Sequence, residues 1–576
     1  MYKIKGLSVS NGIAIGKARI VRQKAMIIPD YEIETHQIET EIELFKSSIN
    51  AATKEIDEFI KDFELTKEDE NIIDTHKMIL LDPDLHLMVE NLVRNDKKNL
   101  EHAVHIHFTK TIDYFKNLDN EFYAERSVDY EDVYQRLMRH LKQIDNNVFS
   151  EVNAGDVVII NDMPPSMVSD LYYKKVGGII LLKGTKTSHS VIIAKAYGLP
   201  VITAIKYLHQ IYNDDLLIID AKKGFIIGNP DEATLKEFTE RKNKIDTETS
   251  ELQKYKEIKS TTDGLGNLKI LSNIELSMEI NQVLEINSDG VGLFRTEFLY
   301  LNRQNLPSEE EQFAEYKMMA EKLADKVFVI RTIDIGGDKV AGWWSPTKEA
   351  NPYLGCRGIR FSLKYKNVFK AQLRAILRAS AFGNIHIMFP MITTVEEFLE
   401  AKGVLKECEK ELKKELIAFD ANILVGTMIE VPSAAICSEA LAKHCDFFSI
   451  GTNDLLQYTV ATDRNNESIA TYYNPYNPAF LQLILKTVKS GIKYGKPVAV
   501  CGELAADLNF TAFLLSAGVT ELSVGTDHTL VLRKHISELN GKLRFTNSIL
   551  DELEDCSTID DTMKLINKIN NGRLEK

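Results

Sequence analysis

A long stretch near the start of the chain lacks glycine, and this absence restricts the fold of that stretch more than any other feature. Of the 30 glycines among 576 residues, none lies between Gly16 and Gly155, and the only prolines there are Pro29 and Pro83. Glycine and proline are the residues that most often interrupt regular structure. The sequence therefore predicts a helical domain over residues 21–147.

Apolar residues recur at helical spacing within this stretch. One set repeats in steps of four and three, the stripe of a long amphipathic helix: Ile38, Ile42, Phe45, Ile49, Ala52, Ile56, Phe59 and Phe63. Asp82-Pro83-Asp84 predicts the start of another helix, because an acidic cap followed by proline suits the first turn. Its apolar face is expected to consist of Leu87, Val89, Leu92 and Val93.

Short strands are predicted on both sides of the helical stretch. Residues 1–20 alternate and are broken by glycines, and 148–228 contain four apolar candidates: Val157 to Asn161, Gly178 to Leu182, Pro200 to Thr203 and Leu216 to Ile219. We therefore expect one α/β domain, formed by 1–20 and 148–228, into which the helices are inserted. Asn229-Pro230-Asp231 then opens a charged run that predicts a linker helix over 229–262.

Eight apolar runs follow in residues 263–576, each separated by enough chain for a helix. They are Ile270 to Ile274, Val291 to Phe294, Val327 to Thr332, Ile385 to Pro390, Ile423 to Glu430, Phe447 to Gly451, Val498 to Cys501 and Leu522 to Val524. Eight buried strands with crossover helices favour a (β/α)8 barrel, with an open doubly wound sheet as the alternative. The fold class is thus a multidomain α/β protein.

Composition excludes several classes of protein. The length predicts about four domains. A formal charge of −14 is the wrong sign for a protein that mainly binds nucleic acid or an anionic membrane. No apolar run is long enough to span a membrane or direct export. The six cysteines are nowhere spaced as a zinc or disulfide motif, which indicates a reducing, cytoplasmic location.

Charged side chains are concentrated where the predicted barrel strands end. In a (β/α)8 barrel these ends carry the reactive residues. The candidates are Arg295, Arg331, Glu430, Asn453, Asp454, Arg464 and Cys501. Arginines bind phosphate and carboxylate oxygens, and two carboxylates can hold a hard divalent cation such as Mg²⁺. Any one of these charges alone would be an ordinary ion pair, but together they predict a site for a small phosphorylated acid. A thiol beside an enolate can donate a proton.

A histidine follows another predicted strand, in Lys183-Gly184-Thr185-Lys186-Thr187-Ser188-His189-Ser190, just before a predicted helix. Free backbone N–H groups at a helix start and the neighbouring hydroxyls could stabilise a phosphoryl group on the imidazole. A histidine in this setting is more often a polar cap. The phosphate-like site elsewhere in the chain favours the functional interpretation of His189.

These motifs resemble Enzyme I of the bacterial sugar phosphotransferase system, the phosphoenolpyruvate-protein phosphotransferases, over essentially the whole chain. The matching segments are Thr187-Ser188-His189-Ser190, Gly290 to Glu297, Met428-Ile429-Glu430-Val431-Pro432 and Ser449 to Leu455. The resemblance implies a swivelling phosphohistidine domain, a helical domain that docks the histidine phosphocarrier protein HPr, and a barrel that binds phosphoenolpyruvate and dimerises.

The resemblance also implies a role for each candidate residue. His189 is expected to be phosphorylated on Nε2 and Cys501 to protonate the enolpyruvate. Further implied roles are phosphoenolpyruvate binding by Arg295, Arg331, Asn453, Asp454 and Arg464, Mg²⁺ binding by Glu430 and Asp454, and orientation of the histidine by Arg126 and Asp129. Two departures from the family pattern stand out: Gly184-Thr185-Lys186 before the histidine, and Val168 where the family has a threonine.

Two alternatives stay open at this point. A pyruvate phosphate dikinase or phosphoenolpyruvate synthase would share the histidine motif, but it needs an additional ATP-binding domain, and residues 1–188 contain no glycine-rich phosphate loop. A catalytically silent regulatory homologue would keep the fold without the activity. All matched catalytic positions are filled in this sequence, which counts against it.

Overall fold

The computed structural model describes most of the chain. The described residues are 1–21, 28–62, 76–116, 121–142, 149, 151–161, 163, 165–182, 191, 194, 197–203, 210–258, 261–262, 266–300, 306–336, 349–464, 466–539 and 548–571. The chain divides into two compact units, Met1–Ser250 and Glu251–Lys576. Each unit has hydrophobic cores of its own.

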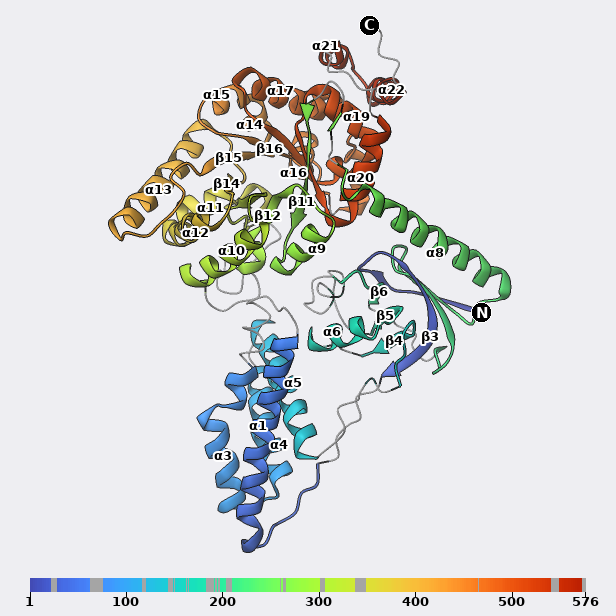
Figure 1. Ribbon diagram of the computed structural model, residues 1–576, viewed down its shortest axis with the longest axis vertical. Coiled ribbons are helices and arrows are strands. Elements are labelled where there is room, and N and C mark those ends of the chain that lie inside the picture. The colour runs from blue at the N-terminus through green and yellow to red at the C-terminus, as the bar shows by residue number, and fades with distance from the viewer. Residues whose placement is uncertain are drawn as a thin grey trace. The chain divides into compact units, whose positions relative to one another are not determined.

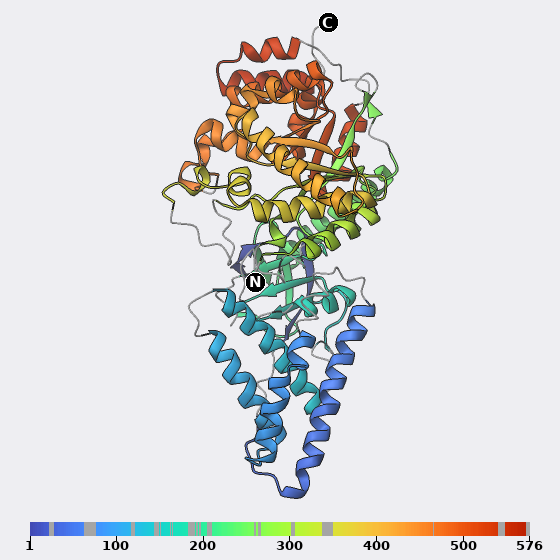
Figure 2. The same ribbon diagram turned by 90° about the vertical axis from the view of Figure 1, so that its left-hand side faces the viewer.

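Long helices run side by side in the N-terminal unit (Figure 2). They are α1 (Ile38–Asp62), α3 (Pro83–Arg94), α4 (Leu100–Lys116) and α5 (Glu121–Leu141). The stripe predicted for α1 is buried at Ile42, Phe45, Ile49, Ala52 and Ile56. These side chains pack with apolar residues of the other three helices in one core, so the predicted helical domain is confirmed.

Helix α3 begins as the sequence predicts, and of the four residues predicted for its apolar face only Leu87 points away from the core. The Asp82 side chain caps it by accepting a hydrogen bond from the backbone N–H of Asp84 at 2.9 Å. The buried residues are Leu85, Val89 and Val93, which recur every four positions. The prediction that Leu87 faces the core is wrong, since its side chain is 63% exposed. Leu87 lies two positions from the buried residues Leu85 and Val89, and side chains two positions apart point to different sides of a helix.

One sheet of eight strands forms the rest of this unit, in the order β1-β8-β7-β3-β4-β5-β6-β2. The strands are β1 (Tyr2–Lys5), β2 (Leu7–Ser8), β3 (Ile13–Val21), β4 (Val157–Ile160), β5 (Gly178–Leu181), β6 (Val201–Thr203), β7 (Leu216–Asp220) and β8 (Phe225–Gly228). Strand β8 is additional to the predicted set. Strands β3 and β4 pair in parallel, with Ala18 opposite Val157, so the chain leaves the sheet into the helices and returns beside its point of departure.

A charged helix leads out of this sheet. Helix α8 (Glu232–Leu252) is followed by the short 3₁₀ helix η3 (Gln253–Tyr255). Phe238 is its only buried residue and packs on Ile13, Ile218 and Ile227. Arg241 adds an ion pair of 2.9 Å to Asp220. The rest of the helix is exposed or half-buried, in agreement with the linker helix expected from the charge pattern.

Eight parallel strands close into a barrel in the C-terminal unit, which confirms the predicted fold and excludes the open sheet. They are β11 (Lys269–Ile274), β12 (Gly290–Arg295), β13 (Val327–Arg331), β14 (Ile385–Phe389), β15 (Leu424–Ile429), β16 (Phe448–Gly451), β17 (Val498–Cys501) and β18 (Glu521–Gly525). Every strand overlaps an apolar run identified in the sequence. A two-stranded ladder, β9 (Thr261–Thr262) with β10 (Gly266–Asn267), precedes them.

Helices surround the barrel strands (Figure 1). They are α9 (Ile280–Glu285), α10 (Glu309–Leu323), α11 (Ile359–Lys364), α12 (Lys366–Ala379), α13 (Val395–Lys414), α14 (Pro432–Ile436), α15 (Ser438–Ala442), α16 (Thr452–Val460), α17 (Pro478–Tyr494), α18 (Glu503–Ala506), α19 (Leu508–Ala517), α20 (Thr526–Leu539), α21 (Ser548–Glu554) and α22 (Ile559–Asn570). No helix in the described parts of the chain has the length and apolar character needed to cross a membrane.

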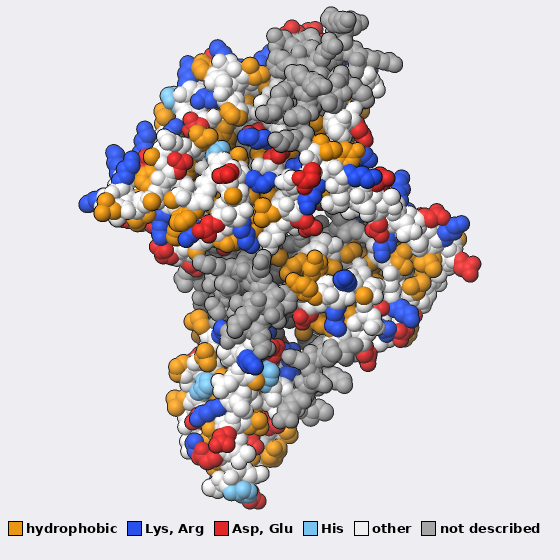
Figure 3. All heavy atoms as spheres, viewed as in Figure 1, with side chains coloured by type: hydrophobic (Ala, Val, Ile, Leu, Met, Phe, Trp, Pro, Cys, Tyr) orange, Lys and Arg blue, Asp and Glu red, His pale blue; other side chains and the backbone are white. Residues whose placement is uncertain are grey.

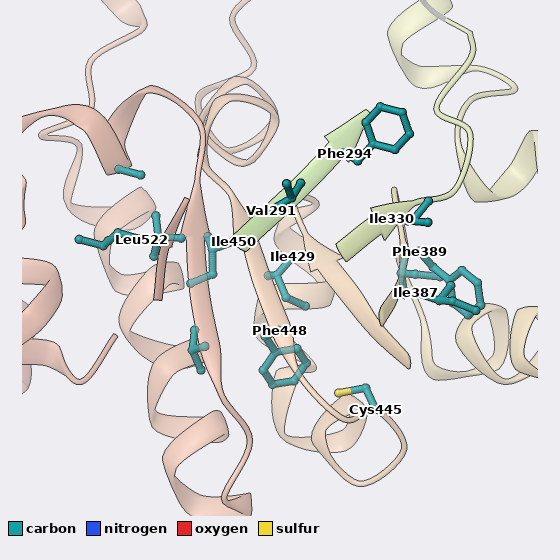
Figure 4. Close-up of a cluster of buried hydrophobic side chains, with 14 of the residues drawn as sticks. Val291, Phe294, Ile330, Ile387, Phe389, Ile429, Cys445, Phe448, Ile450 and Leu522 are labelled. Carbon is teal, nitrogen blue, oxygen red and sulfur yellow. The ribbon is translucent and has the colours of Figure 1, made fainter. Parts of the chain in front are cut away.

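The largest hydrophobic core lies between these strands and helices. Figure 4 shows part of it, including Phe294, Ile330, Phe389 and Ile450 of four barrel strands. The rings of Phe294 and Phe328 pack 5.8 Å apart between centroids. A second, smaller cluster contains Leu293, Val329, Met388, Met428, Phe447 and Cys501. The strands are thus anchored on both sides, which fixes the positions of their ends.

The separate cores predict that a cavity in one unit destabilises that unit. Phe45→Ala and Phe328→Ala each remove a fully buried ring, at an expected cost of about 3–5 kcal/mol. Scanning calorimetry should show Phe45→Ala lowering one transition and Phe328→Ala lowering another. Leu416→Ala is the control, since Leu416 is 92% exposed and its change should cost less than about 0.5 kcal/mol. Equal shifts of all transitions in both variants would contradict independent cores.

Candidate active site

The candidate residues of the barrel lie at one end of it, where the strands finish. Arg295 and Arg331 are the last residues of β12 and β13 and stand opposite each other in the strand register. Glu430 follows β15, Asp454 lies in the first turn of α16 directly after β16, and Cys501 ends β17. Parallel strands present all these ends on the same rim.

A buried glutamine fixes the ends of β12 and β13. Gln372 of α12 accepts a hydrogen bond from the backbone N–H of Ile333 at 2.9 Å and donates one to the Thr296 hydroxyl at 3.1 Å. That hydroxyl in turn donates to the carbonyl of Arg331 at 2.8 Å. A fully buried amide with both ends satisfied holds the backbone rigidly, so Arg331 starts from a defined position.

The guanidinium of Arg331 is buried between two carboxylates. Its Nη2 is paired with Glu297 and lies 3.3 Å from Asp334 Oδ2. Burial lowers the pKa of Arg331, but Glu297 and Asp334 raise it more, so the arginine stays charged. Its Nη1 faces the sulfur of Met428 at 3.6 Å, and its Nε has no hydrogen-bond partner among the described residues. Among the described residues, Arg331 therefore has N–H donors that face no oxygen acceptor.

Arg357 links two of the carboxylates, and the sequence analysis missed it. The side chain is buried and donates to Asp334 Oδ1 and Oδ2 at 3.1 Å each, and to Asp454 Oδ1 at 3.0 Å and Oδ2 at 3.3 Å. Its Nη1 also donates to the Tyr458 hydroxyl at 3.1 Å. Burial lowers the pKa of Arg357, but the two aspartates raise it by more than burial lowers it. This group therefore also stays charged.

Glu430 interacts electrostatically with these charged side chains. The side chain is buried, and one carboxylate oxygen accepts a hydrogen bond from the backbone N–H of Met391 at 2.6 Å. Burial, then the negative charges of Asp454 and Asp334, raise the pKa of Glu430 to about 7, although Arg331 and Arg357 oppose the shift. The negative charge around Glu430 is therefore compensated only in part.

Cys501 is buried beside this cluster. Its thiol donates to the carbonyl of Ile450 at 3.4 Å and accepts from the Ser449 hydroxyl at 3.5 Å. Burial is the largest cause that raises the pKa of Cys501, with a smaller contribution from Glu430 in the same direction. The thiol therefore keeps its proton at neutral pH, as a proton donor must.

The remaining barrel candidates are more exposed. Arg295 pairs with Glu275, and its side chain is 36% exposed. Arg464 Nη1 lies 3.8 Å from Asp454 Oδ2. The Asn453 side-chain oxygen accepts from the backbone N–H of Glu503 at 3.0 Å, which ties the ends of β16 and β17 together. These side chains border the buried cluster and remain accessible to a ligand.

The structure does not place the N-terminal candidates in this cluster. His189, with Thr185 and Lys186, lies outside the described residues. Arg126 and Asp129 lie on α5, and their side chains are likewise outside what the structure describes. Val168, the departure from the family threonine, is fully buried among Val158, Leu171, Val191 and Ala194. Its environment is apolar.

Glycines around Arg357 were the signal that could have located it. Gly336 has φ +119°, and a Cβ there would lie 2.6 Å from the Cys356 carbonyl oxygen. Gly358 has φ +56°, and a Cβ there would lie 3.2 Å from Asp334 Oδ1. A side chain at position 336 would collide with the loop that carries Arg357, whereas one at position 358 would collide with the Met391 side chain, 2.8 Å away. Gly336 thus marks the place where the backbone after β13 comes close to the loop of Arg357, and Gly358 lies directly after the arginine in that loop.

Two carboxylates of the rim have the chemistry of divalent-cation ligands. Glu430 and Asp454 are both buried and offer hard oxygen atoms of the kind that such cations prefer. These residues fit a Mg²⁺ ion. Within the described ranges, no three His, Cys, Asp or Glu side chains converge as a complete metal site, so other oxygens would have to finish the shell.

The chain matches known proteins over most of its length. Three family models match: "PEP-utilising enzyme, N-terminal" at residues 5–126, "PEP-utilising enzyme, mobile domain" at 152–224, and "PEP-utilising enzyme, PEP-binding domain" at 249–540. The third of these models covers every residue of the rim cluster. The described rim residues and the histidine motif therefore belong to two different domains of one type of enzyme.

Curated relatives match this chain over nearly its whole length. The phosphoenolpyruvate-protein phosphotransferase of Priestia megaterium is 37% identical over 93% of this chain and 94% of its own. That of Staphylococcus epidermidis is 35% identical over 98% and 99%, and that of Staphylococcus carnosus 34% identical over 98% of each. With this identity over nearly its whole length, the chain belongs to the phosphoenolpyruvate-protein phosphotransferase family.

Proposed function

We propose that the protein transfers the phosphoryl group of phosphoenolpyruvate to its own His189 and then to a histidine of the phosphocarrier protein HPr, releasing pyruvate. The observation that carries the proposal is the rim cluster of the barrel. There the Nε–H of the buried Arg331 has no partner among the described residues, and two further arginines, Arg295 and Arg464, lie at the same rim. Three arginines match a substrate that carries both a phosphate and a carboxylate.

The first step is an in-line displacement at phosphorus. The P–N bond to His189 Nε2 forms as the P–O bond to the enol oxygen breaks, and the electron pair stays on that oxygen as an enolate. Arg295, Arg331 and Arg464 hold the phosphate and carboxylate oxygens and stabilise the charge that moves between them. Asn453 and Asp454 orient the substrate at the end of β16.

Cys501 completes this half-reaction. Burial keeps the thiol protonated, so it can give its proton to the terminal carbon of the enolate and form pyruvate. The thiolate left behind would be buried and costly, and it therefore takes a proton back from solvent. The Ser449 hydroxyl, which donates to the sulfur at 3.5 Å, supports the thiolate during the exchange.

We assign Mg²⁺ to Glu430 and Asp454. A bound cation supplies Lewis-acid stabilisation of the substrate oxygens. Glu430 must lose its proton before it can act as a ligand. Because its pKa is raised to about 7, cation affinity should weaken as the pH falls below that value.

The helical bundle is the proposed docking site for HPr. Besides Leu87, it exposes Met78 by 73% and Leu81 by 54%, and hydrophobic side chains are visible on the bundle surface in Figure 3. We define Met78, Leu81 and Leu87 as the apolar patch. Exposed apolar side chains around one helix start suit a protein partner. Arg126 and Asp129 of α5 are the proposed residues that orient the histidine.

The proposed domains follow from these roles. The histidine domain consists of residues 1–20 and 148–228, and the domain that docks the carrier consists of 21–147. A linker helix over 229–262 leads to the barrel, 263–576, which binds the substrate and mediates homodimerisation in the cytoplasm. A transferred phosphoryl group moves only between atoms in contact, so the histidine domain has to visit both the substrate and the carrier.

Phosphoenolpyruvate labelled in its phosphorus tests the proposal. With Mg²⁺, the wild-type protein should acquire an acid-labile label that His189→Ala lacks, because the nucleophile is missing. His528→Ala is the matched control, since its side chain is 51% exposed on α20 and takes no part in the site. Labelling that depends on a nucleotide would indicate a dikinase. Label that never leaves for HPr would contradict the partner.

Arg331→Lys separates charge from hydrogen-bonding geometry. Lysine keeps the charge but loses the fork of donors, so KM for phosphoenolpyruvate should rise about tenfold to a hundredfold. Steady-state phosphorylation of HPr measures the change. Arg378→Lys is the control, because Arg378 pairs with Glu309 and Glu310 away from the rim. An unchanged KM in Arg331→Lys would remove Arg331 from the substrate site.

Leu87→Glu tests the apolar patch. Leu87 is exposed, so the change should alter stability by less than about 0.5 kcal/mol. It should slow transfer to HPr at least about tenfold, because a charge replaces apolar contact area, and leave self-phosphorylation unchanged. Leu416→Glu, on an exposed barrel residue, should affect neither reaction. Normal transfer by Leu87→Glu would move the docking site elsewhere.

A further inference from the structure

A chain of hydrogen-bonded polar side chains crosses the apolar layer between the barrel strands and helices α10 and α12. The side-chain oxygen of Gln312 accepts hydrogen bonds from the hydroxyls of Tyr300 at 2.8 Å and Tyr316 at 3.1 Å. The Tyr316 hydroxyl in turn accepts from the amide of Gln372 at 3.4 Å. All four side chains are fully buried. We define the amide relay as Thr296, Gln312, Tyr316 and Gln372.

The amide relay ends on the backbone at both sides of Thr332. Gln372 Nε2 donates to the Thr296 hydroxyl at 3.1 Å, and this hydroxyl donates to the carbonyl of Arg331 at 2.8 Å. Gln372 Oε1 accepts from the backbone N–H of Ile333 at 2.9 Å. The amide has only one possible orientation, because turning it over would set its NH₂ group against the N–H of Ile333. Helix α12 therefore fixes the end of β13 in a single geometry.

The surroundings of the amide relay are otherwise apolar. The Tyr316 ring packs edge-on against Phe294, with 6.3 Å between ring centroids, and Phe328 and Phe369 belong to the same core. Buried hydrogen-bonded pairs contribute little more to stability than apolar groups of the same shape. They differ in that their partners must keep one arrangement to stay satisfied. Polar side chains in this layer therefore restrict geometry more than they add stability.

We propose that Gln372 is a positioning residue for phosphoenolpyruvate, which acts on the substrate through Thr296 and the backbone of Arg331. The proposal rests on the proposed function, through the assignment of Arg331 to the substrate. Glu297, the residue after Thr296, pairs with the guanidinium of Arg331. Thr296 thus fixes the carbonyl of Arg331 while its neighbour fixes the side chain, so a displaced Gln372 amide moves both together.

Binding of phosphoenolpyruvate to the full-length His189→Ala protein tests the proposal, because this variant lacks the nucleophile that would consume the substrate. Titration calorimetry with excess Mg²⁺ gives the Kd. Gln372→Met in this background keeps the length of the side chain and removes its three hydrogen bonds. The Kd should rise at least about tenfold, since small displacements of a binding group are costly.

Ser438→Ala is the matched control for the loss of a buried hydrogen bond. The Ser438 and Ser490 hydroxyls lie 2.8 Å apart between helices α15 and α17 and make no contact with the amide relay. This change should lower the melting temperature and leave the Kd for phosphoenolpyruvate unchanged. A similar rise of Kd in Ser438→Ala and Gln372→Met would trace the effect to general destabilisation and overturn the proposal.

Thr296 provides a conservative pair of variants. Thr296→Val removes the hydroxyl and should raise the Kd about fivefold, whereas Thr296→Ser keeps it and should stay within about twofold of the parent protein. Because Gln372 acts through Thr296, combining Thr296→Val with Gln372→Met should weaken binding no further than Gln372→Met alone. If Gln372→Met does not fold, the comparison of Thr296→Val with Thr296→Ser decides.

Three results would refute the positioning role. An unchanged Kd in Gln372→Met with a lowered melting temperature would mean that Gln372 only stabilises the barrel. Equal losses in Thr296→Val and Thr296→Ser would show that the hydroxyl is not the link. Fully additive losses in the combined variant would show that the two residues act separately.

The outcome for Gln372 can be separated from the outcome for phosphotransfer. A Kd that rises in Gln372→Met, together with a wild-type protein that takes no label from phosphoenolpyruvate, would keep the positioning role and reject the transfer to His189. A labelled wild type with an unchanged Kd in Gln372→Met would keep the transfer and reject the positioning role.

Discussion

Burial of ionised side chains at the barrel rim is the constraint on which the rest of the site depends. Each ion costs several kcal/mol to remove from water, so such groups persist only where charges of the opposite sign lie beside them. Glu297, Arg331, Asp334, Arg357 and Asp454 form such an alternating chain. Because every member lies beside a charge of the opposite sign, removal of one member would leave an uncompensated buried charge.

The barrel stabilises this arrangement of charges because it fixes the strand ends from both sides. Apolar residues pack outward against the helices and inward around Met388 and Met428, and Gln372 ties two strand ends together. Rigid strand ends place side chains that are far apart in the sequence within hydrogen-bond distance, as for Arg357 and Asp454, which are 97 positions apart. A preorganised site of this kind stabilises moving charge without rearranging at the moment of reaction.

Much of this could be predicted from the sequence, and the failures have identifiable causes. The apolar runs located all eight barrel strands, because a strand buried on both faces has to be continuously apolar. Polar residues at the run ends located Arg331, Glu430 and Asp454. Leu87 was assigned to the wrong face, since local hydrophobicity does not say which side of a helix meets the core. Arg357 lies on a loop outside any run, so periodicity carried no information about it.

The sequence by itself determined the kinds of element, their order, the family and the chemical types gathered at the strand ends. These depend on local patterning and on motifs, which a linear chain records directly. Tertiary structure alone decided which charges share a carboxylate, that burial raises the pKa of Glu430, and that the N–H groups of Arg357 all donate to protein acceptors. Those properties arise from distances across the barrel and from exclusion of water, and no stretch of sequence contains either.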